Sequence, residues 1–268
     1  MSESANAFPG LCRQWRQQRG LSQLALATAA SVSQRHLSWL ESGRSRPSRA
    51  MVLRLAEAMS LPLREQNRLL QAAGYAPRYL ESLLDAPCME LVNDALHKIL
   101  THHLPYPALV LDRHWNWVMG NAAAEYLLDL AGVSLTERTF NLAEATLSES
   151  GLLRYVRNRE TALPPFLQRL RYEASVRGDT AFLSRIESLA RQLALPQPDE
   201  QVDYEPLLPV IPLVLDLEGV QLSLFTVLST FGTPQDLTTD ELRIESFYPA
   251  DSQTREFFLG IGSQSAPE

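Results

Sequence analysis

Apolar residues near the start of the chain recur at helical spacing in short segments that are separated by turn signals. Within residues 22–42, the apolar positions fall where two steeply crossing helices would share a small core: Leu26, Ala27, Ala30, Val32, Leu37 and Leu40. Ser33 is a good N-cap for the second helix, and Gly43 is a typical stop. The pattern therefore predicts helices over 22–30 and 34–42. Ser31 occupies the turn, where a left-handed backbone usually carries glycine.

The same spacing extends the helical region on both sides of this pair. Further helices are predicted over residues 11–19, from Pro47-Ser48 to Met59, and from Pro62 to Ala73. Five short helices predict an all-α domain over residues 1–76. A hinge is expected over 77–87, because Gly74-Tyr-Ala-Pro77 and Ala86-Pro87 interrupt the helical pattern.

The polar positions of the helix pair form an exposed row at the start of the second helix. The outward-facing residues are Gln23, Ser33, Gln34, Arg35 and Ser38, and Arg44 and Arg46 lie just beyond Gly43. A helix laid in the major groove of DNA presents such N-terminal side chains to base edges, where Gln suits adenine and Arg suits guanine. The pattern predicts double-stranded DNA as a partner. The alternative is an ordinary helical bundle in which a Ser-capped helix has one solvent-exposed face.

The charges divide the chain into two oppositely charged parts. Residues 1–75 contain ten arginines and four acidic residues, for a net charge of +6, whereas the remainder contains 14 basic and 27 acidic residues, for −13. A basic domain neutralises phosphates, but the DNA duplex repels an acidic one. The charge contrast therefore favours a DNA-binding domain followed by a domain with another task.

From residue 88 on, strand patterns alternate with helical ones. A helix is predicted over 88–103, with Leu91, Ala95, Leu96, Ile99 and Leu100 inward. Strands are predicted over 109–111 and 117–120, and Asn121 is expected to cap a helix over 122–130. Three later strands, over 210–217, 220–231 and 242–248, complete an antiparallel sheet of about five strands. Between the two strand groups, amphipathic helices over 159–174 and 180–195 form an insertion that encloses an apolar interior.

The N-terminal segment resembles the XRE-type helix-turn-helix domain, the type found in phage repressors and Cro. The resemblance includes the run Leu40-Glu-Ser-Gly-Arg-Ser-Arg-Pro-Ser48. It implies that Gln23 bridges to phosphate, that Gln34, Arg35 and Ser38 reach bases, and that Arg44 and Arg46 hold the DNA backbone. Trp39 is expected to pack rather than to face the groove.

The strand, turn, strand, Asn, helix order at 109–130 resembles the opening of a PAS domain. The whole chain is similar to the MmyB-like transcription regulators, and three phrases carry this similarity: Tyr106-Pro-Ala-Leu-Val-Leu-Asp-Arg-His-Trp-Asn116, Thr230-Phe-Gly-Thr-Pro-Gln-Asp236 and Glu241-Leu-Arg-Ile-Glu-Ser-Phe-Tyr-Pro-Ala-Asp251. The resemblance implies a PAS-like domain over 88–268 that senses a small amphipathic ligand, for which a fatty acid has been suggested. The predicted fold class is α+β.

A candidate ligand site follows from the last strand. Alternation sends Arg243, Glu245 and Phe247 to one face, which places an arginine on an otherwise apolar sheet. Arg243 is expected either to bind a ligand carboxylate or to pair with Glu245. The other candidate ligand-binding residues are Trp117, Asn121, Phe166, Leu170, Phe225 and Phe231. Asn121 is alternatively only a helix cap, and His114 and Trp115 are expected to be exposed in a turn.

Other function classes receive no support from the sequence. The chain shows no phosphate-binding glycine loop, nucleophile elbow, paired-cysteine motif or metal-ligand spacing, so no enzyme, cofactor or metal is expected. A cytoplasmic location is expected because no apolar leader or membrane-spanning run is present, with nucleoid association on DNA. A homodimer is expected because one helix-turn-helix domain contacts too few base pairs to specify a single site in a genome. The alternative for the second domain is that it only dimerises or docks a protein partner.

Overall fold

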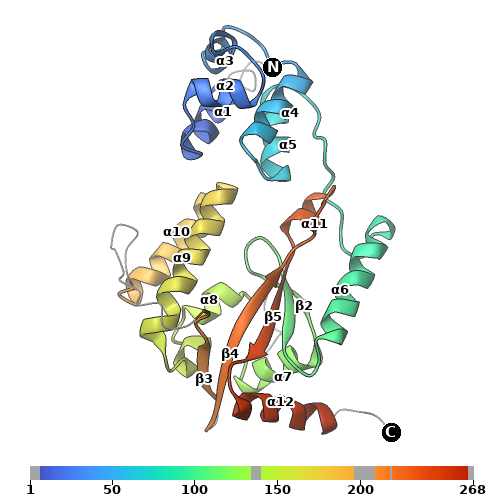
Figure 1. The fold of residues 1–268 in the computed structure, drawn as a ribbon, viewed down its shortest axis with the longest axis vertical. Coiled ribbons are helices and arrows are strands. Elements are labelled where there is room, and N and C mark those ends of the chain that lie inside the picture. The colour runs from blue at the N-terminus through green and yellow to red at the C-terminus, as the bar shows by residue number, and fades with distance from the viewer. Residues whose placement is uncertain (1–6, 134–139, 196–208, 218, 265–268) are drawn as a thin grey trace. The chain divides into compact units, whose positions relative to one another are not determined.

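The computed structural model describes residues 7–133, 140–195, 209–217 and 219–264 (Figure 1). Contacts within the chain divide it into two units. The N-terminal unit consists of residues 1–82 together with 234–240, and the C-terminal unit consists of 83–233 and 241–268.

Five helices form the described residues 7–72 of the N-terminal unit, as the sequence predicted. They are α1 (Ala7–Gln18), α2 (Gln23–Ala29), α3 (Gln34–Glu41), α4 (Arg49–Ala58) and α5 (Leu63–Ala72). The side chains of Ser22, Ser33 and Ser48 cap α2, α3 and α4 by accepting hydrogen bonds from first-turn backbone N–H groups. The φ angle of Ser31 is 54°, which confirms the left-handed turn between α2 and α3. This turn lets Leu26 and Leu37 meet in the buried core.

A segment from the far end of the sequence completes this unit. Residues 234–240, which include most of α11 (Leu237–Glu241), contact the chain around residues 80–82. The backbone N–H of Leu237 donates to the carbonyl of Leu80, and the carboxylate of Asp236 accepts from both the backbone and the hydroxyl of Ser82. Asp240 accepts from the backbone N–H of Leu63, where α5 begins. The sequence pattern did not predict this helix or its position.

A five-stranded antiparallel sheet is the centre of the C-terminal unit, again as predicted. The strands are β1 (Ala108–Leu111), β2 (Trp117–Gly120), β3 (Leu213–Leu217), β4 (Val220–Ser229) and β5 (Arg243–Pro249). Their order in the sheet is β2-β1-β5-β4-β3. β5 therefore lies at the centre, paired with β1 on one side and β4 on the other. A central strand offers both faces to packed layers, which makes its side chains candidates for a buried site.

Alternating residues of β1 enter two separate cores. Ala108 and Val110 pack in a small core with α6 (Glu90–His102), which follows a 3-10 turn over Pro87–Met89. Leu109 and Leu111 enter a larger core on the other face of the sheet. The prediction that Leu91 and Ile99 face inward was wrong, since these side chains are 85% and 39% exposed. The core takes up only the narrower stripe of α6 that includes Leu96 and Leu100.

The remaining helices of this unit are α7 (Ala122–Leu130), α8 (Leu142–Thr146), α9 (Arg159–Arg177), α10 (Thr180–Gln192) and α12 (Ser252–Gln264), with a 3-10 turn over Leu152–Tyr155. The pattern predicted α7, α9 and α10 but neither α8 nor α12. Figure 1 shows α9 and α10 side by side on one side of the sheet, and α6 on the other. Gly178 adopts a positive φ of 64° and ends α9, which allows α10 to turn back against it.

Candidate DNA-reading helix and ligand cavity

Helix α3 presents the polar row that the sequence singled out. Gln34 and Arg35 in its first turn are exposed, as are Arg44 and Arg46 just after its end, whereas Ser38 is half-buried. Ser33 accepts a hydrogen bond from the backbone N–H of His36 and so serves as the N-cap. Gln34 and Arg35 are thus accessible at the N-terminal end of a short helix, which is the end that reads bases in the major groove.

The prediction that Trp39 packs was wrong, since this side chain is 37% exposed and is not part of the core of the unit. The guanidinium carbon of Arg35 lies 4.6 Å from the centre of the Trp39 ring. Such a cation–π contact restricts a long arginine side chain to fewer conformations. Trp39 therefore supports the position of Arg35.

A buried carboxylate fixes α3 to the rest of the unit. Glu41 is 3% exposed and accepts hydrogen bonds from Arg16 Nε at 2.7 Å, Arg16 Nη2 at 3.0 Å and Gln23 Nε2 at 2.9 Å. Burial alone would raise the pKa of Glu41, but the hydrogen bonds from Arg16 and Gln23 and the charges of Arg16 and Arg13 lower it overall. One side chain at the end of α3 thus joins α1, α2 and α3.

The role expected for Gln23 is restricted by this contact. Its amide nitrogen donates one hydrogen to Glu41, and its side chain is half-buried. An amide nitrogen carries two hydrogens, so one remains for a phosphate oxygen. A phosphate contact by Gln23 stays a proposal, and Glu41 would hold the amide in place for it.

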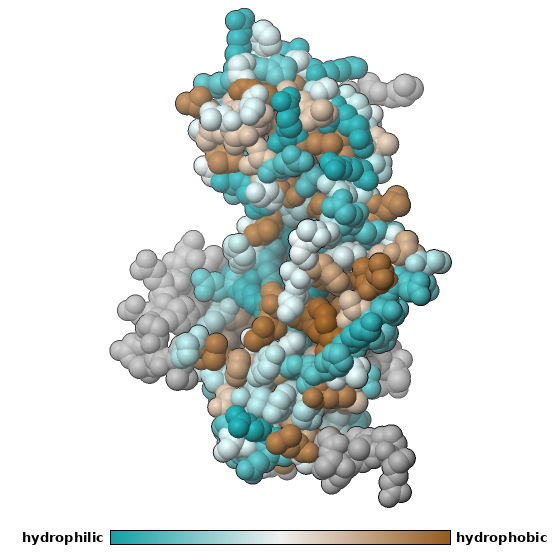
Figure 2. All heavy atoms as spheres, turned by 45° about the vertical axis from the view of Figure 1, so that its right-hand side comes forward, coloured by the Kyte–Doolittle hydropathy of each residue, from teal (hydrophilic) through white to brown (hydrophobic). Residues whose placement is uncertain are grey.

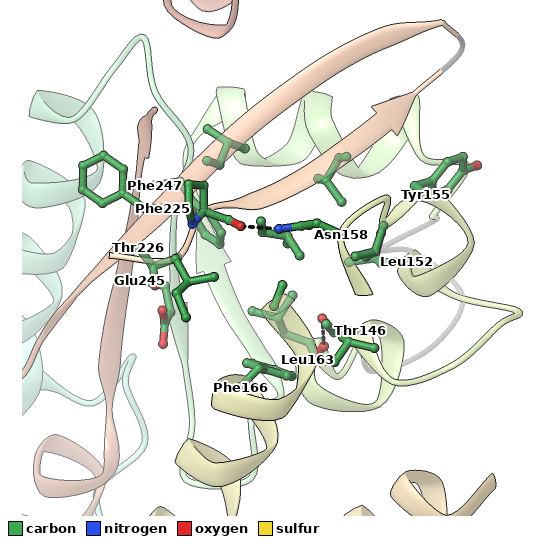
Figure 3. Close-up of a pocket in the computed structure, with 18 of the residues that line it drawn as sticks. Thr146, Leu152, Tyr155, Asn158, Leu163, Phe166, Phe225, Thr226, Glu245 and Phe247 are labelled. Carbon is green, nitrogen blue, oxygen red and sulfur yellow. Dashed lines mark hydrogen bonds between the residues drawn. The ribbon is translucent and has the colours of Figure 1, made fainter. Parts of the chain in front are cut away.

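Within the C-terminal unit, a cavity of about 910 Å³ lies between the sheet and the helices of the large core (Figure 3). This volume falls in the range of pockets that hold small organic molecules. Most of the wall is apolar, and it includes Leu109, Leu127, Leu152, Leu163, Phe166, Leu215, Leu224, Phe225 and Phe247. Figure 3 shows Phe225, Phe247 and Glu245 on the sheet side, Phe166 and Leu163 on α9, and Leu152 and Tyr155 at the other end.

Three polar groups of the wall are engaged with other protein groups. The Tyr155 hydroxyl donates to the carbonyl of Ala131, the Thr146 hydroxyl donates to that of Leu142, and Asn158 Nδ2 donates to that of Pro212. Each of these three groups thus uses a donor hydrogen on the protein rather than on a bound molecule. The cavity is therefore suited to an apolar molecule over most of its length.

One end of the cavity is ionic. Arg169 of α9 and Glu245 of β5 both line the wall there, and both Nη atoms of Arg169 donate to the carboxylate of Glu245. Arg169 Nε donates to Glu173 at 3.0 Å, one helical turn further along α9. The ionic end thus joins the insertion helix to the central strand.

Arg243 lies beside this pair but is not among the residues that line the cavity. It is 2% exposed, and its Nη1 donates to Glu173 rather than to Glu245. Burial lowers the pKa of Arg243 to about 10, opposed by the nearby negative charge of Glu245. Pairing with Glu245, one of the two alternatives predicted for Arg243, is replaced by two crossed pairs, Arg243 with Glu173 and Arg169 with Glu245.

The structure places the other predicted ligand residues in different surroundings. Phe166 and Phe225 line the cavity, whereas Leu170 is fully buried in the core without lining it. Trp117 packs edge-on against Phe140, with ring centres 6.2 Å apart, and is not part of the lining. Phe231 packs with the small core on the α6 side of the sheet.

The buried side chain of Asn121 connects three elements of the fold through hydrogen bonds. Its side chain caps α7 at the N–H of Ala124, accepts from the N–H of Ala108, and donates to the carbonyls of Leu100 and Tyr106. These four bonds engage both ends of the amide. Asn121 thereby links α6, β1 and α7.

The prediction that Trp115 is exposed was wrong, because this side chain is 1% exposed and lines the cavity. Asp112 accepts from the backbone N–H groups of His114 and Asn116, which tightens the turn, and Trp115 has a positive φ of 69°. This backbone conformation turns the indole inward. Its Nε1 donates to Glu173 at 3.1 Å, and its ring lies 4.8 Å and 5.0 Å from the guanidinium carbons of Arg169 and Arg243.

Sequence reasoning missed Arg169 and Glu173. They stand four residues apart on α9, a spacing that puts both on one face of the helix. That face points at the sheet, so charged residues there would have signalled a buried ionic site. The available signal was that Arg169 and Glu173 share a helix face with the buried Ala162 and the partly buried Phe166.

The surface carries apolar residues among polar ones, and Figure 2 shows brown and teal patches intermixed over the face in view. The most exposed large apolar side chains include Leu80, Leu83 and Leu91, at 75%, 76% and 85%. Among the helices described, none is both long enough and apolar enough to cross a membrane.

Comparisons with known proteins identify both parts of the chain. The family model of the MmyB-like transcription regulator ligand binding domain matches residues 92–259, and that of a helix-turn-helix domain matches residues 11–70. A comparison with curated protein sequences finds no match. The first match covers more than half of the chain, its limits include the whole cavity wall, and it confirms the resemblance inferred from the sequence. The chain therefore belongs to the MmyB-like transcription regulators, with a DNA-binding helix-turn-helix domain ahead of the ligand-binding domain.

Proposed function

We propose that a small amphipathic molecule with an acyl chain, such as a fatty acid, occupies the cavity of the C-terminal unit and controls the affinity of the helix-turn-helix domain for its operator. The observation that supports this proposal is the cavity of about 910 Å³, which is apolar along its length and ionic at one end. An acyl chain gains about 25 cal/mol for each Å² of apolar surface removed from water. The head group would lie at Arg169.

On the DNA side, we propose the roles that the exposed row supports. Gln34, Arg35 and Ser38 contact base edges, and Arg44 and Arg46 contact phosphates. Two copies of the chain would bind two half-sites about 34 Å apart or a multiple of that distance. The domain limits 1–76 and 88–268, with a hinge at 77–87, remain part of this proposal, as does action in the bacterial cytoplasm on nucleoid DNA.

The second candidate function is that the C-terminal unit only dimerises or docks a protein partner. The exposed leucines Leu83 and Leu91 favour some role in association. Ligand binding requires an open cavity, whereas association with a partner does not. If the unit serves only as a dimer or docking module, filling the cavity will leave DNA binding unchanged.

The proposed function is tested by blocking the cavity from inside. Leu163 lies on the cavity wall, so Leu163→Trp places an indole in the space of the acyl chain. Gln168→Trp adds the same side chain to the exposed face of the same helix and serves as the control. We expect wild type and Q168W, stripped of bound lipid, to bind dodecanoate in a calorimetric titration, and L163W to lose binding. Equal binding by L163W, or none by wild type, would contradict the proposal.

A further inference from the structure

Beside the ionic end of the cavity, two buried hydrogen-bond donors have no acceptor in the described part of the chain. We use the name ionic cluster for Arg169, Glu173, Arg243 and Glu245. Among the residues that the structure describes, Nε and Nη2 of Arg243 are buried and have no hydrogen-bond partner. Arg177 adds a further cation 3.8 Å from Glu173. Buried donors without acceptors are costly, so this cluster favours the arrival of another acceptor.

The position of the cluster determines where an incoming acceptor can bind. Arg169 and Glu245 line the cavity, whereas Arg243 and Glu173 do not. A ligand in the cavity therefore meets Arg169, not the unsatisfied edge of Arg243. All three nitrogens of the Arg169 guanidinium already donate, Nε to Glu173 and both Nη atoms to Glu245. A ligand anion must compete with Glu245 for Arg169.

Glu245 has a second cation within reach if it is displaced. Arg243 and Glu245 are two residues apart on β5, so their side chains leave the same face of the sheet. Neighbours on one face lie about 7 Å apart, a gap that a long arginine side chain can span. The unsatisfied Nε and Nη2 of Arg243 offer a planar edge that matches a carboxylate. Displacing Glu245 from Arg169 therefore does not leave its buried carboxylate without a cationic partner.

We propose that Glu245 is the specificity-determining residue of this cavity and that it admits an anionic head group by exchanging ion-pair partners. This inference rests on the proposed function. The ligand carboxylate binds Arg169, and Glu245 moves to the free edge of Arg243. The exchange satisfies the two unpartnered donors. A neutral head group cannot displace Glu245, so it gains only the burial of its tail.

The proposal predicts opposite behaviour for two probes that share one tail, decanoate and 1-decanol. Glu245→Gln removes the competing charge and frees Arg169, so the delipidated full chain should bind decanoate about tenfold more tightly or better, since charge-assisted hydrogen bonds are the strong ones. Its affinity for 1-decanol should stay within about twofold, because burial of the tail is unchanged. Glu125→Gln alters an exposed glutamate of α7 that is not part of the cavity wall, and it should change neither affinity.

A second substitution tests the exchange itself. Arg243→Lys keeps a positive charge near Glu173 but lacks the planar edge that would receive Glu245. It should weaken decanoate binding in the Glu245 background and have little effect in the Glu245→Gln background. Arg169→Gln should abolish the preference for decanoate over 1-decanol, and it supplies a test should Arg243→Lys not fold.

The outcomes separate this inference from the proposed function. If both probes bind wild type but Glu245→Gln changes their affinities equally, Glu245 does not select the head group and the inference is overturned. Equal effects of Arg243→Lys in both backgrounds would overturn the exchange of partners. If neither probe binds wild type, the proposed function fails and this inference fails with it.

Discussion

The buried carboxylate of Glu41 should be one of the largest single contributions to the stability of the DNA-reading unit. Glu41→Gln keeps the shape of the side chain but removes the charge opposite Arg16 and Arg13. Removing one partner of a buried ion pair costs about 3–5 kcal/mol. Arg16 retains its hydrogen bond to the carbonyl of Leu21, and its side chain is 11% exposed. We therefore expect Glu41→Gln to lower the free energy of opening by the smaller value of this range, about 3 kcal/mol. The equilibrium constant for opening the unit then becomes roughly hundredfold larger.

The same residue gives this unit an acid dependence with a defined sign. Because the folded-state pKa of Glu41 lies below its ordinary value of 4.5, its contribution is fully present at neutral pH. The contribution is lost as the pH falls from that ordinary value through the lowered one. Wild type and Glu41→Gln should therefore differ most near pH 7 and converge in acid.

Native-state hydrogen exchange measures this effect in the full chain, because peptides that cover α3 report the opening of the N-terminal unit alone. Glu57→Gln removes an exposed acid from α4 of the same unit and provides the control. Its opening free energy should match that of wild type within about 0.5 kcal/mol. If Glu41→Gln behaves like Glu57→Gln at pH 7, the carboxylate does not hold the three helices together and the reasoning is refuted.

Three further predictions follow from the remaining geometry. Arg35→Ala should cost about 1–3 kcal/mol on the preferred operator and relax preference at one base pair, whereas Arg46→Ala should weaken all sequences and flatten the salt dependence; identical behaviour across a site library would contradict the two roles. Trp115→Phe should remove the fluorescence change that dodecanoate causes, and Trp117→Phe should retain it, since the Trp115 indole lines the cavity and that of Trp117 does not; a response that depends on Trp117 would contradict this prediction. Gly120→Ala should destabilise the C-terminal unit by about 1–3 kcal/mol, because a Cβ there would lie 2.2 Å from the Trp117 ring, and a thermal shift below about 1 °C would show that the ring moves aside easily.

The sequence predicted the regular elements well because their signals are local. Serine caps, apolar spacing and the Gly178 stop each act within one or two helical turns, and they mark α2, α3, α9 and α10. The strand pattern likewise predicted the antiparallel sheet. The short helices α8 and α11 were not predicted, because a helix of five residues shows too little periodicity, although Asn141 caps α8.

The candidate site was harder to predict because its residues meet through long-range packing. Trp115 resembles an exposed turn residue in sequence, and only a positive φ and a bond to Glu173 bring it inward. The alternation of β5 correctly put Arg243 and Glu245 on one face. It could not show that Arg169 lies opposite, since pairing across layers depends on how α9 packs against the sheet.

The central claim is that the cavity and the DNA-reading helix are energetically coupled. The most direct test is the Kd of the full, delipidated chain for an operator selected from a random library, measured with and without saturating dodecanoate. Coupling between two sites is typically worth 1–3 kcal/mol, so the account predicts a change of about fivefold or more in wild type. The change should be absent in Leu163→Trp and retained in Gln168→Trp. An operator Kd that stays constant in wild type while dodecanoate demonstrably fills the cavity would contradict the account.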